Sequence, residues 1–315
     1  MPEGDSVWRT AHRLDDALSG RRLLDADLRW PGISTARLAG MTVVETVPRG
    51  KHILTRLDSG WTLHSHLRMD GSWVIRRTIP DDKASAVKTP SLPAADAAWR
   101  SSSGIVRVGQ RVSGRRPESM GGGFVRAVLA GTDYTAIGVD LGMLDLVRTA
   151  DEHTLVGHLG PDLLDPGFDA ERAVANLAAA DTTIGAALLD QTNLAGIGTI
   201  WASETLFAER LPPWLPVADL PGSALAAVVE RARRFLNASI QHATPSSTGF
   251  TQRGRNTYVH GRSGRPCRRC GTTVRVASIG PPLRERPMFY CPGCQGGLGP
   301  TDGGRTAAPL GSGRR

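Results

Sequence analysis

The sequence predicts an α+β protein with several domains: an N-terminal β-sandwich with a flanking helix, then an all-α domain, with a four-cysteine zinc finger near the C-terminus. Three observations predict this order. Alternating apolar and polar segments fill about the first 145 positions, helical periodicity follows from Asp151, and all four cysteines lie within about the last fifty residues. A chain of 315 residues is long enough for two domains that each bury a core.

The N-terminal domain, which we expect to span residues 2–145, begins with a helix. Asp5 or Ser6 can cap the first turn, and residues 5–18 place four apolar side chains on one stripe: Val7, Ala11, Leu14 and Leu18. Short segments then follow between Gly, Pro and Asp, namely "MTVVETV", "KHILTRL", "WTLHSHL" and "GSWVIRR". They are typical of antiparallel strands, so the helix should lie on a β-sandwich.

The composition changes twice further along the chain. Residues 80–123 are rich in Ser, Pro, Ala, Gly and Arg, which indicates a mobile insertion with a ragged strand inside it. Residues 150–245 carry helical periodicity, for example in "DAERAVANLAAAD" and "IWASETLFAERL", and form the predicted all-α domain. The Gly-rich, basic tail at 296–315 should be disordered.

The cysteines predict one structural zinc ion in a zinc finger at residues 257–295. Cys267 and Cys270 form one Cys-x2-Cys knuckle, and Cys291 and Cys294 form the other. Two such turns can place four thiolates about 2.3 Å from Zn²⁺, and four thiolates leave no open position for chemistry. A disulfide is the less favoured alternative, because the first residues lack the apolar core of a signal peptide.

The charge predicts a polyanionic partner. Lys and Arg number 38 against 30 Asp and Glu, and Arg275, Arg284 and Arg286 lie between the two knuckles. Arginine suits contact with phosphate, although a basic face that is only solvated is the alternative. A turn in "LLDQTNLAGIGTIWASE" could also offer backbone N–H groups to a phosphate, but many helical hairpins contain such a turn. No apolar run is long enough to span a membrane, so we expect a cytoplasmic protein.

The N-terminus "MPEGDSVWRT" has two interpretations. It could be an ordinary frayed end with a proline at a helix entry. Alternatively, removal of the initiator methionine would leave Pro2 with a free secondary amine, directly followed by the Glu3 carboxyl group.

Four motifs in order resemble the formamidopyrimidine-DNA glycosylase and endonuclease VIII family: "MPEGD", "RGKHILTRLDSGWTLHSHLRMDGSW", "GAALLDQTNLAGIGTIWASETLFAERLPP" and "VHGRSGRPCRRCG" with "RPMFYCPGCQ". The resemblance covers residues 2 to about 295. It implies that the all-α domain is a helix-two-turn-helix domain. It also implies base excision repair by a monomer near the nucleoid, on double-stranded DNA with damaged bases or abasic sites, the damaged base being flipped out of the duplex.

The resemblance also implies catalytic roles. Pro2 would be the nucleophile that attacks the deoxyribose C1′ and forms a Schiff base, and Glu3 would be the proton shuttle that opens the sugar ring. Lys51 would bind phosphate and assist proton transfer. Arg286 would support the δ-elimination that follows β-elimination. Taken alone, Lys51 would be an exposed strand lysine and Arg286 a surface or core arginine.

The same resemblance implies four DNA contacts: Met69, Asn193, Thr199 and Arg262. Met69 would fill the space left by the flipped base, although a methionine of the sandwich core is the alternative. Three features depart from the family pattern. Thr199 stands where an asparagine is common, the loop between the knuckles is a few residues longer, and "GTDYTAIGVDLGMLDL" replaces an arginine pair followed by Phe-Gly.

The last departure places the chain on the endonuclease VIII side, so oxidised pyrimidines and abasic sites are the expected substrates. The alternative is a damaged-DNA-binding protein of the same fold that lacks turnover, and Thr199 is its main motive. Pro2, Glu3, Lys51 and Arg286 together favour a bifunctional glycosylase and abasic-site lyase, because a binding protein needs no free terminal amine.

Overall fold

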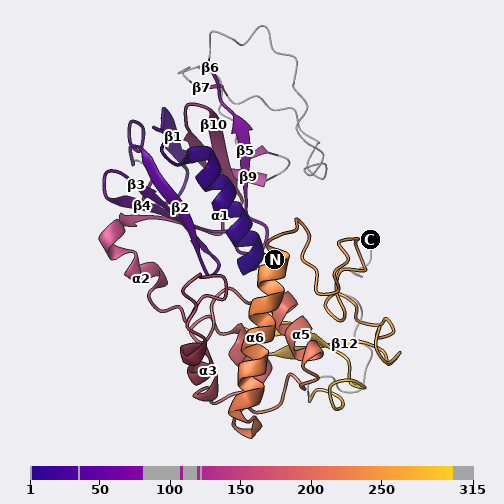
Figure 1. The fold of residues 1–315 in the computed structure, drawn as a ribbon. Helices are drawn as coiled ribbons and strands as arrows, with labels where there is room; N and C mark the ends of the chain where they lie inside the picture. The colour runs from indigo at the N-terminus through magenta and orange to yellow at the C-terminus, as the bar shows by residue number, and fades with distance from the viewer. Residues whose placement is uncertain (1, 35, 81–106, 109–118, 121–122, 301–315) are drawn as a thin grey trace. The chain divides into compact units, whose positions relative to one another are not determined.

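The computed structural model describes residues 2–34, 36–80, 107–108, 119–120 and 123–300 (Figure 1). These residues form two compact units. The first contains residues 10–48 and 52–152, and the second contains Pro2–Arg9, Arg49–Lys51 and the chain from His153 onward. Most of the predicted insertion at 80–123 and most of the predicted tail at 296–315 lie outside the described residues. The predicted domain boundaries stay predictions.

The first unit contains two antiparallel sheets. One has the order β1 (Asp25–Leu28), β9 (Gly123–Ala130), β10 (Tyr134–Val139) and β5 (Ser72–Arg77), and the short strand β8 (Ser119–Met120) pairs with β9. The other has the order β11 (Met143–Arg148), β4 (Trp61–His66), β3 (His52–Leu57) and β2 (Val43–Arg49). The indole N–H of Trp73 on β5 donates to the Ser65 hydroxyl on β4 at 3.1 Å and so joins the two sheets.

Alternation explains these strands. Trp73, Ile75 and the facing Ala136 have the same side-chain direction in the register of β5 and β10, whereas Val74 and Ile137 have the opposite one. Two further short strands, β6 (Ile79–Pro80) and β7 (Arg107–Val108), pair in parallel where the described chain is interrupted. The predicted strand segments are therefore observed.

Helix α1 (Gly4–Leu18) has the stripe that the sequence predicts. Val7, Ala11, Leu14 and Leu18 are all buried, and Asp5 lies in its first turn. The backbone N–H of Glu3 donates to the Ser6 hydroxyl at 2.9 Å, and that hydroxyl donates to the Glu3 carbonyl oxygen. The helix therefore starts directly behind Glu3, for which the family resemblance implies a catalytic role.

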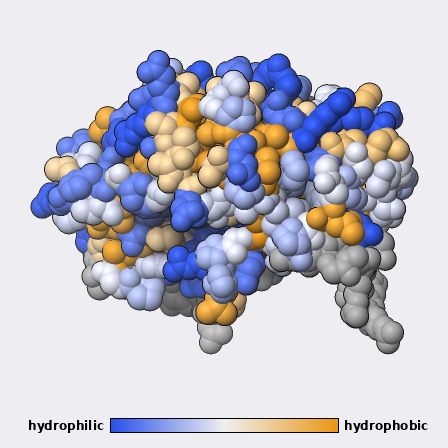
Figure 2. Space-filling view, turned by 90° about the horizontal axis from the view of Figure 1, so that it is seen from below, coloured by the Kyte–Doolittle hydropathy of each residue, from blue (hydrophilic) through white to orange (hydrophobic). Residues whose placement is uncertain are grey.

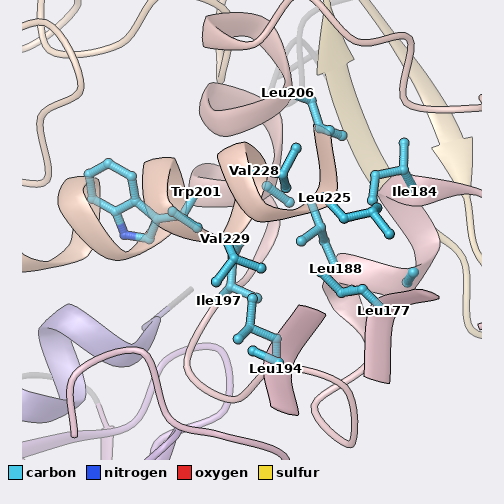
Figure 3. Close-up of a cluster of buried hydrophobic side chains, with 14 of the residues drawn as sticks. Leu177, Ile184, Leu188, Leu194, Ile197, Trp201, Leu206, Leu225, Val228 and Val229 are labelled. Atoms are coloured by element: carbon cyan, nitrogen blue, oxygen red, sulfur yellow. The ribbon is translucent and has the colours of Figure 1, made fainter. Parts of the chain in front are cut away.

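The second unit is helical. Its helices are α2 (His153–Val156), α3 (Ala170–Ala178), α4 (Ile184–Leu189), α5 (Thr199–Ala208) and α6 (Gly222–Ser239), and α5 packs against α6. The Asp169 side chain caps α3 by accepting the N–H of Arg172. Figure 3 shows the core that these helices share, built from the buried residues Leu177, Ile184, Leu188, Leu194, Ile197, Trp201, Leu206, Leu225, Val228 and Val229.

The four-cysteine region follows as a hairpin of β12 (Arg275–Ile279) and β13 (Arg286–Tyr290). Phe289 of β13 packs with Phe207 of α5 and with Val259, so the hairpin is part of the second unit's core. The α+β fold class is confirmed, with N-terminal sheets, a helical domain and a C-terminal four-cysteine cluster. Figure 2 shows one face, where hydrophilic residues surround small apolar areas. Within the described residues, no helix is both long and apolar enough to cross a membrane.

Candidate active site and metal centre

The Glu3 carboxylate sits on the N-terminus of α5. Its Oε1 accepts the N–H of Ile200 at 2.7 Å, and its Oε2 accepts those of Gly198 at 2.9 Å and Trp201 at 3.3 Å. These N–H groups have no partner inside the helix, and the helix dipole favours a negative charge beside them. Glu3, which is only 1% exposed, therefore caps the N-terminus of α5 although it lies far away in the sequence.

Gly198 makes this approach possible. A Cβ atom at this position would lie 2.5 Å from Cδ of Glu3, so any larger residue would push the carboxylate away from the helix. The neighbouring backbone also holds the segment, because the N–H of Gly4 donates to the Gly196 carbonyl oxygen at 2.8 Å. The backbone of the "GIG" turn, residues 196–198, therefore binds Glu3 and Gly4.

Burial raises the pKa of Glu3 from 4.5 to about 7. The nearby Lys51 ammonium and the N–H groups of Ile200 and Trp201 oppose this shift, and Asp5 adds to it. A carboxyl group with a pKa near 7 can both donate and accept a proton near neutral pH, as general acid–base catalysis requires. Pro2, which is partly exposed, precedes it directly.

Lys51 lies at the end of the hairpin turn between β2 and β3. Gly50 has a φ of +58°, a value that favours glycine, and its N–H donates to Oδ2 of the buried Asp162 at 2.6 Å. The other oxygen of Asp162 accepts the N–H of Leu164 at 3.0 Å. Asp162 thereby fixes the turn that carries Lys51 to the segment that precedes the helical core.

Burial lowers the pKa of Lys51 from 10.5 to about 8. The Glu3 carboxylate opposes this shift, and the Arg286 guanidinium adds to it. The pKa of this lysine is therefore close to neutral pH, so its amine can gain or lose a proton with little driving force. Glu3 and Arg286 both act electrostatically on Lys51, so the structure brings these predicted catalytic residues together around the lysine.

Arg286 is the exposed first residue of β13, and α5 fixes the position of that strand. The Ser203 hydroxyl accepts the N–H of Phe289 at 3.2 Å and donates to Sδ of Met288 at 3.3 Å. One helix thus holds Glu3 at its N-terminus and the strand of Arg286 at its second turn. Sequence reasoning missed Ser203, because an isolated serine in a helix gives no signal.

Glu204, the next residue of α5, holds the loop before the first knuckle. It is fully buried, and its carboxylate accepts the N–H groups of Tyr258 at 2.8 Å, Val259 at 2.9 Å and His260 at 2.7 Å, and the hydroxyl of Ser247. Burial raises its pKa, and these donors oppose the shift. The sequence could have indicated a role for Glu204, because it is the one charged residue of the apolar helix α5 and a buried charge needs hydrogen-bond partners.

The four cysteines fit a metal ion. Their sulfur atoms all lie within 4.8 Å of one another, with 3.9 Å between Cys267 and Cys294 and 3.4 Å between Cys270 and Cys291. A tetrahedral site with Zn–S bonds of about 2.3 Å needs sulfur atoms about 3.8 Å apart. The donor set and its spacing are therefore those of a closed structural site.

The four predicted DNA contacts have different surroundings. Met69 is 54% exposed in the first unit. The amide of Asn193 donates to the Ala187 carbonyl oxygen at 3.1 Å, and Thr199 is buried at the start of α5. Arg262 is buried and donates to the Pro266 carbonyl oxygen at 2.9 Å. All four roles stay predictions, and Met69 alone among them presents an exposed side chain.

Two family models match the chain. The model of the formamidopyrimidine-DNA glycosylase N-terminal domain covers residues 1–105, and that of the formamidopyrimidine-DNA glycosylase H2TH domain covers residues 159–250. Two similar proteins are the probable endonuclease 8 2 of Streptomyces coelicolor, 45% identical over 97% of this chain and 98% of that protein, and the DNA-(apurinic or apyrimidinic site) lyase Nei2 of Mycolicibacterium smegmatis, 36% identical over 94% and 99%.

Solved structures share the fold. The formamidopyrimidine-DNA glycosylase of Lactococcus lactis, non-covalently bound to DNA with an abasic site, has a TM-score of 0.68 and 20% identity, over 93% of this chain and 99% of that one. The same enzyme in complex with DNA containing an oxidised pyrimidine also has a TM-score of 0.68, with 21% identity over 94% and 100%.

Proposed function

The chain belongs to the formamidopyrimidine-DNA glycosylase and endonuclease VIII family, and we propose that it is a bifunctional DNA glycosylase and abasic-site lyase. The resemblance drawn from the four sequence motifs is confirmed by this membership, and so is the helix-two-turn-helix part of the fold class. Its partner is double-stranded DNA that contains damaged bases or abasic sites, and it works as a monomer at the nucleoid.

The reaction starts at Pro2. Its neutral amine attacks the deoxyribose C1′, the bond from C1′ to the base breaks, the electron pair leaves with the base, and the proton that the amine gives up neutralises the departing base. Glu3 supplies a proton to the ring oxygen O4′, so the sugar opens and a Schiff base forms between Pro2 and C1′. Loss of a C2′ proton then expels the 3′ phosphate in the β-elimination, and loss of the C4′ proton expels the 5′ phosphate, which the Arg286 guanidinium receives. Water finally hydrolyses the Schiff base and restores the amine of Pro2.

One observation carries this proposal: a carboxyl group with a pKa near 7 and an amine with a pKa near 8 share a site directly behind Pro2. Opposite shifts of an acid and a base toward neutrality support proton transfer, whereas a binding surface needs no such tuning. We propose that Lys51 holds a phosphate and exchanges a proton, and the lowered pKa of its amine supports this role.

We propose that the four cysteines hold one structural Zn²⁺. The ion would staple the β12–β13 hairpin and supply no chemistry, because four thiolates fill its coordination sphere. Cys267, Cys270, Cys291 and Cys294 would be its ligands. The contacts between Ser203 of α5 and strand β13 would keep Arg286 in place at the start of that strand.

For the substrate we propose oxidised pyrimidines and abasic sites. The names of the relatives from Streptomyces and Mycolicibacterium support the endonuclease VIII side, and so does the sequence "GTDYTAIGVDLGMLDL". Met69 is exposed enough to fill the space of a flipped base. Asn193, Thr199 and Arg262 are proposed to shape the DNA surface near the site.

The second candidate is a DNA-binding protein without turnover, and the burial of Thr199 favours it, because a buried hydroxyl reaches a phosphate poorly. Borohydride trapping on duplexes with thymine glycol, 8-oxoguanine or an abasic site distinguishes the two. The enzyme gives a covalent adduct that depends on the lesion, and the preferred lesion identifies the substrate. A protein that binds abasic DNA but gives no adduct on any duplex supports the binding protein instead.

A further inference from the structure

We propose that Leu283, at the tip of the β12–β13 hairpin, is a wedge that packs against a base step of the bound DNA in its minor groove. The proposal rests on the proposed function, because it takes duplex DNA as the ligand. It adds a contact that none of the four sequence motifs contains.

The backbone of Leu283 is the first observation. The N–H of Arg284 donates to the Pro281 carbonyl oxygen at 3.0 Å, which closes a β-turn, and Leu283 occupies its third position with a φ of +68°. Glycine or asparagine normally takes this position, because a positive φ crowds the Cβ atom of other residues. The hairpin therefore holds a leucine in a conformation that disfavours leucine.

The exposure of Leu283 is the second observation. The residue is 98% exposed, so no packing offsets its backbone strain. A single exposed leucine means little by itself. Here, however, glycine would relieve the backbone and a polar residue would suit the solvent. A residue that breaks two local rules at once is characteristic of a functional position.

The charges around the tip indicate the ligand. Arg284 and Arg286 follow Leu283 within three residues, whereas Glu285 is the single acidic residue of the hairpin from Arg275 to Tyr290. Apolar side chains that enter the minor groove are accompanied by arginines, which bind the phosphates while the apolar group parts two bases. Leu283 and its neighbours have this composition.

The reach of the tip indicates where it binds. Leu283 lies three residues before Arg286, whose charge acts on Lys51. Three residues span about 10 Å at most, which corresponds to about three nucleotide steps along a strand. The contacted bases should therefore lie within about three steps of the reacting sugar.

Two variants and a control test the wedge on the full-length protein. Leu283→Asn removes the apolar group and suits the turn, Leu283→Met keeps an apolar group, and Leu24→Asn changes another exposed leucine, 50% exposed, in the first unit. Fluorescence anisotropy measures the affinity for a duplex with a tetrahydrofuran abasic analogue. The fluorescence of 2-aminopurine, placed at each of three positions on either side, reports unstacking.

We expect Leu283→Asn to melt no lower than the wild type and to bind about tenfold or more weakly, the loss that corresponds to one buried leucine. Leu283→Met and Leu24→Asn should bind within about threefold of the wild type, on the scale of neutral surface changes. The 2-aminopurine signal should fall in Leu283→Asn at one or two adjacent positions.

Three results would overturn the wedge: wild-type affinity in Leu283→Asn, an unchanged 2-aminopurine signal, or a lower melting temperature of that variant, which would show that the turn prefers leucine. A failure of the proposed function has a different signature. In that case the wild type gives no adduct and does not prefer the abasic duplex, whereas the comparison of Leu283→Asn with Leu283→Met can still be made on undamaged DNA.

Discussion

The carboxylate of Glu3 accepts the backbone N–H of Ile200 at 2.7 Å, across 197 positions of the sequence. This bond ties the N-terminal segment to the first turn of α5, and the same helix contacts β13 through Ser203. The proposed nucleophile and the proposed elimination arginine are therefore placed from one helix. Their roles can be separated by changing one contact at a time.

Glu3→Gln should impair base excision more than strand cleavage. The amide keeps the shape but cannot shuttle a proton, so excision should fall by about 10² to 10⁴. Cleavage at a preformed abasic site should fall less, because no base remains to be expelled. Single-turnover rates on a lesion duplex and on an abasic duplex measure the two losses. Equal losses would remove Glu3 from the excision step.

The stability of the protein should depend on pH through Glu3. Its pKa is raised from 4.5 to about 7, so the folded chain binds this proton more tightly than the unfolded chain does. The corresponding stability is present below pH 4.5 and is lost as the pH rises through 7, by at most about 3 kcal/mol. Lys51 has the opposite sign, because its pKa is lowered to about 8 and its contribution is lost as the pH falls through 8.

Thermal melts between pH 5 and 7.5 test this linkage. The wild-type melting temperature should fall across this range, and the slope should be smaller in Glu3→Gln. Glu230→Gln, a change of an exposed glutamate on α6, should keep the wild-type slope. If all three proteins show the same slope, the carboxyl of Glu3 titrates like an ordinary exposed one.

Sequence patterns predicted the parts of this fold that depend on side-chain identity. Alternation in "KHILTRL" and "WTLHSHL" predicted β3 and β4, and the two Cys-x2-Cys pairs predicted a cluster whose sulfur atoms lie within 4.8 Å. Pattern arguments alone named no catalytic role for Lys51 or Arg286. Those roles came from the family resemblance, and they stay predictions.

What the sequence could not predict are contacts made to the backbone. Asp162 binds the N–H of Gly50, and Glu204 binds three successive N–H groups at 258–260. Every residue except proline carries a backbone N–H group, so the sequence does not show which of these groups a given carboxylate will bind. The burial of a carboxylate can be suspected from an apolar helix, as in α5, but its partners require the structure.

Ser203→Ala should shift the products of strand cleavage. Removing the hydroxyl leaves the N–H of Phe289 without its acceptor and loosens β13, at a cost of about 1–3 kcal/mol. Arg286 would then be held less firmly, so more of the β-elimination product and less of the 3′-phosphate should accumulate. Denaturing gels that resolve both 3′ ends measure the ratio.

Thr205→Val is the matched control for this change. It also removes a buried hydroxyl from α5, but that hydroxyl has no hydrogen-bond partner within the described chain. The control should keep the wild-type product ratio and stability. A product ratio that shifts equally in both variants would mean that general loosening of α5 causes the effect.

Cys270→Ser, or removal of the metal with a chelator, should abolish DNA binding and leave the first unit folded. The metal would staple only the hairpin of β12 and β13, whereas the two sheets bury apolar side chains of their own. Anisotropy on an abasic duplex measures DNA binding, and hydrogen exchange at the backbone N–H groups of β3, β4 and β10 reports whether the first unit stays folded. Native affinity in the chelated protein would show that the hairpin makes no essential DNA contact.

The last prediction concerns the amine of Pro2. A nucleophilic amine must carry a free electron pair, and a preceding peptide bond turns it into an amide without one. A retained initiator methionine or an N-terminal tag should therefore abolish both borohydride trapping and strand cleavage, while binding to the tetrahydrofuran duplex survives. Edman sequencing of the wild-type protein first establishes that Pro2 is its N-terminal residue.

A C-terminal tag provides the control, because it leaves the amine free and should keep full activity. If a blocked protein still cuts abasic DNA at the full rate, the nucleophile is another amine. Lys51 would then be the first candidate, because its pKa of about 8 leaves a substantial neutral fraction near neutral pH.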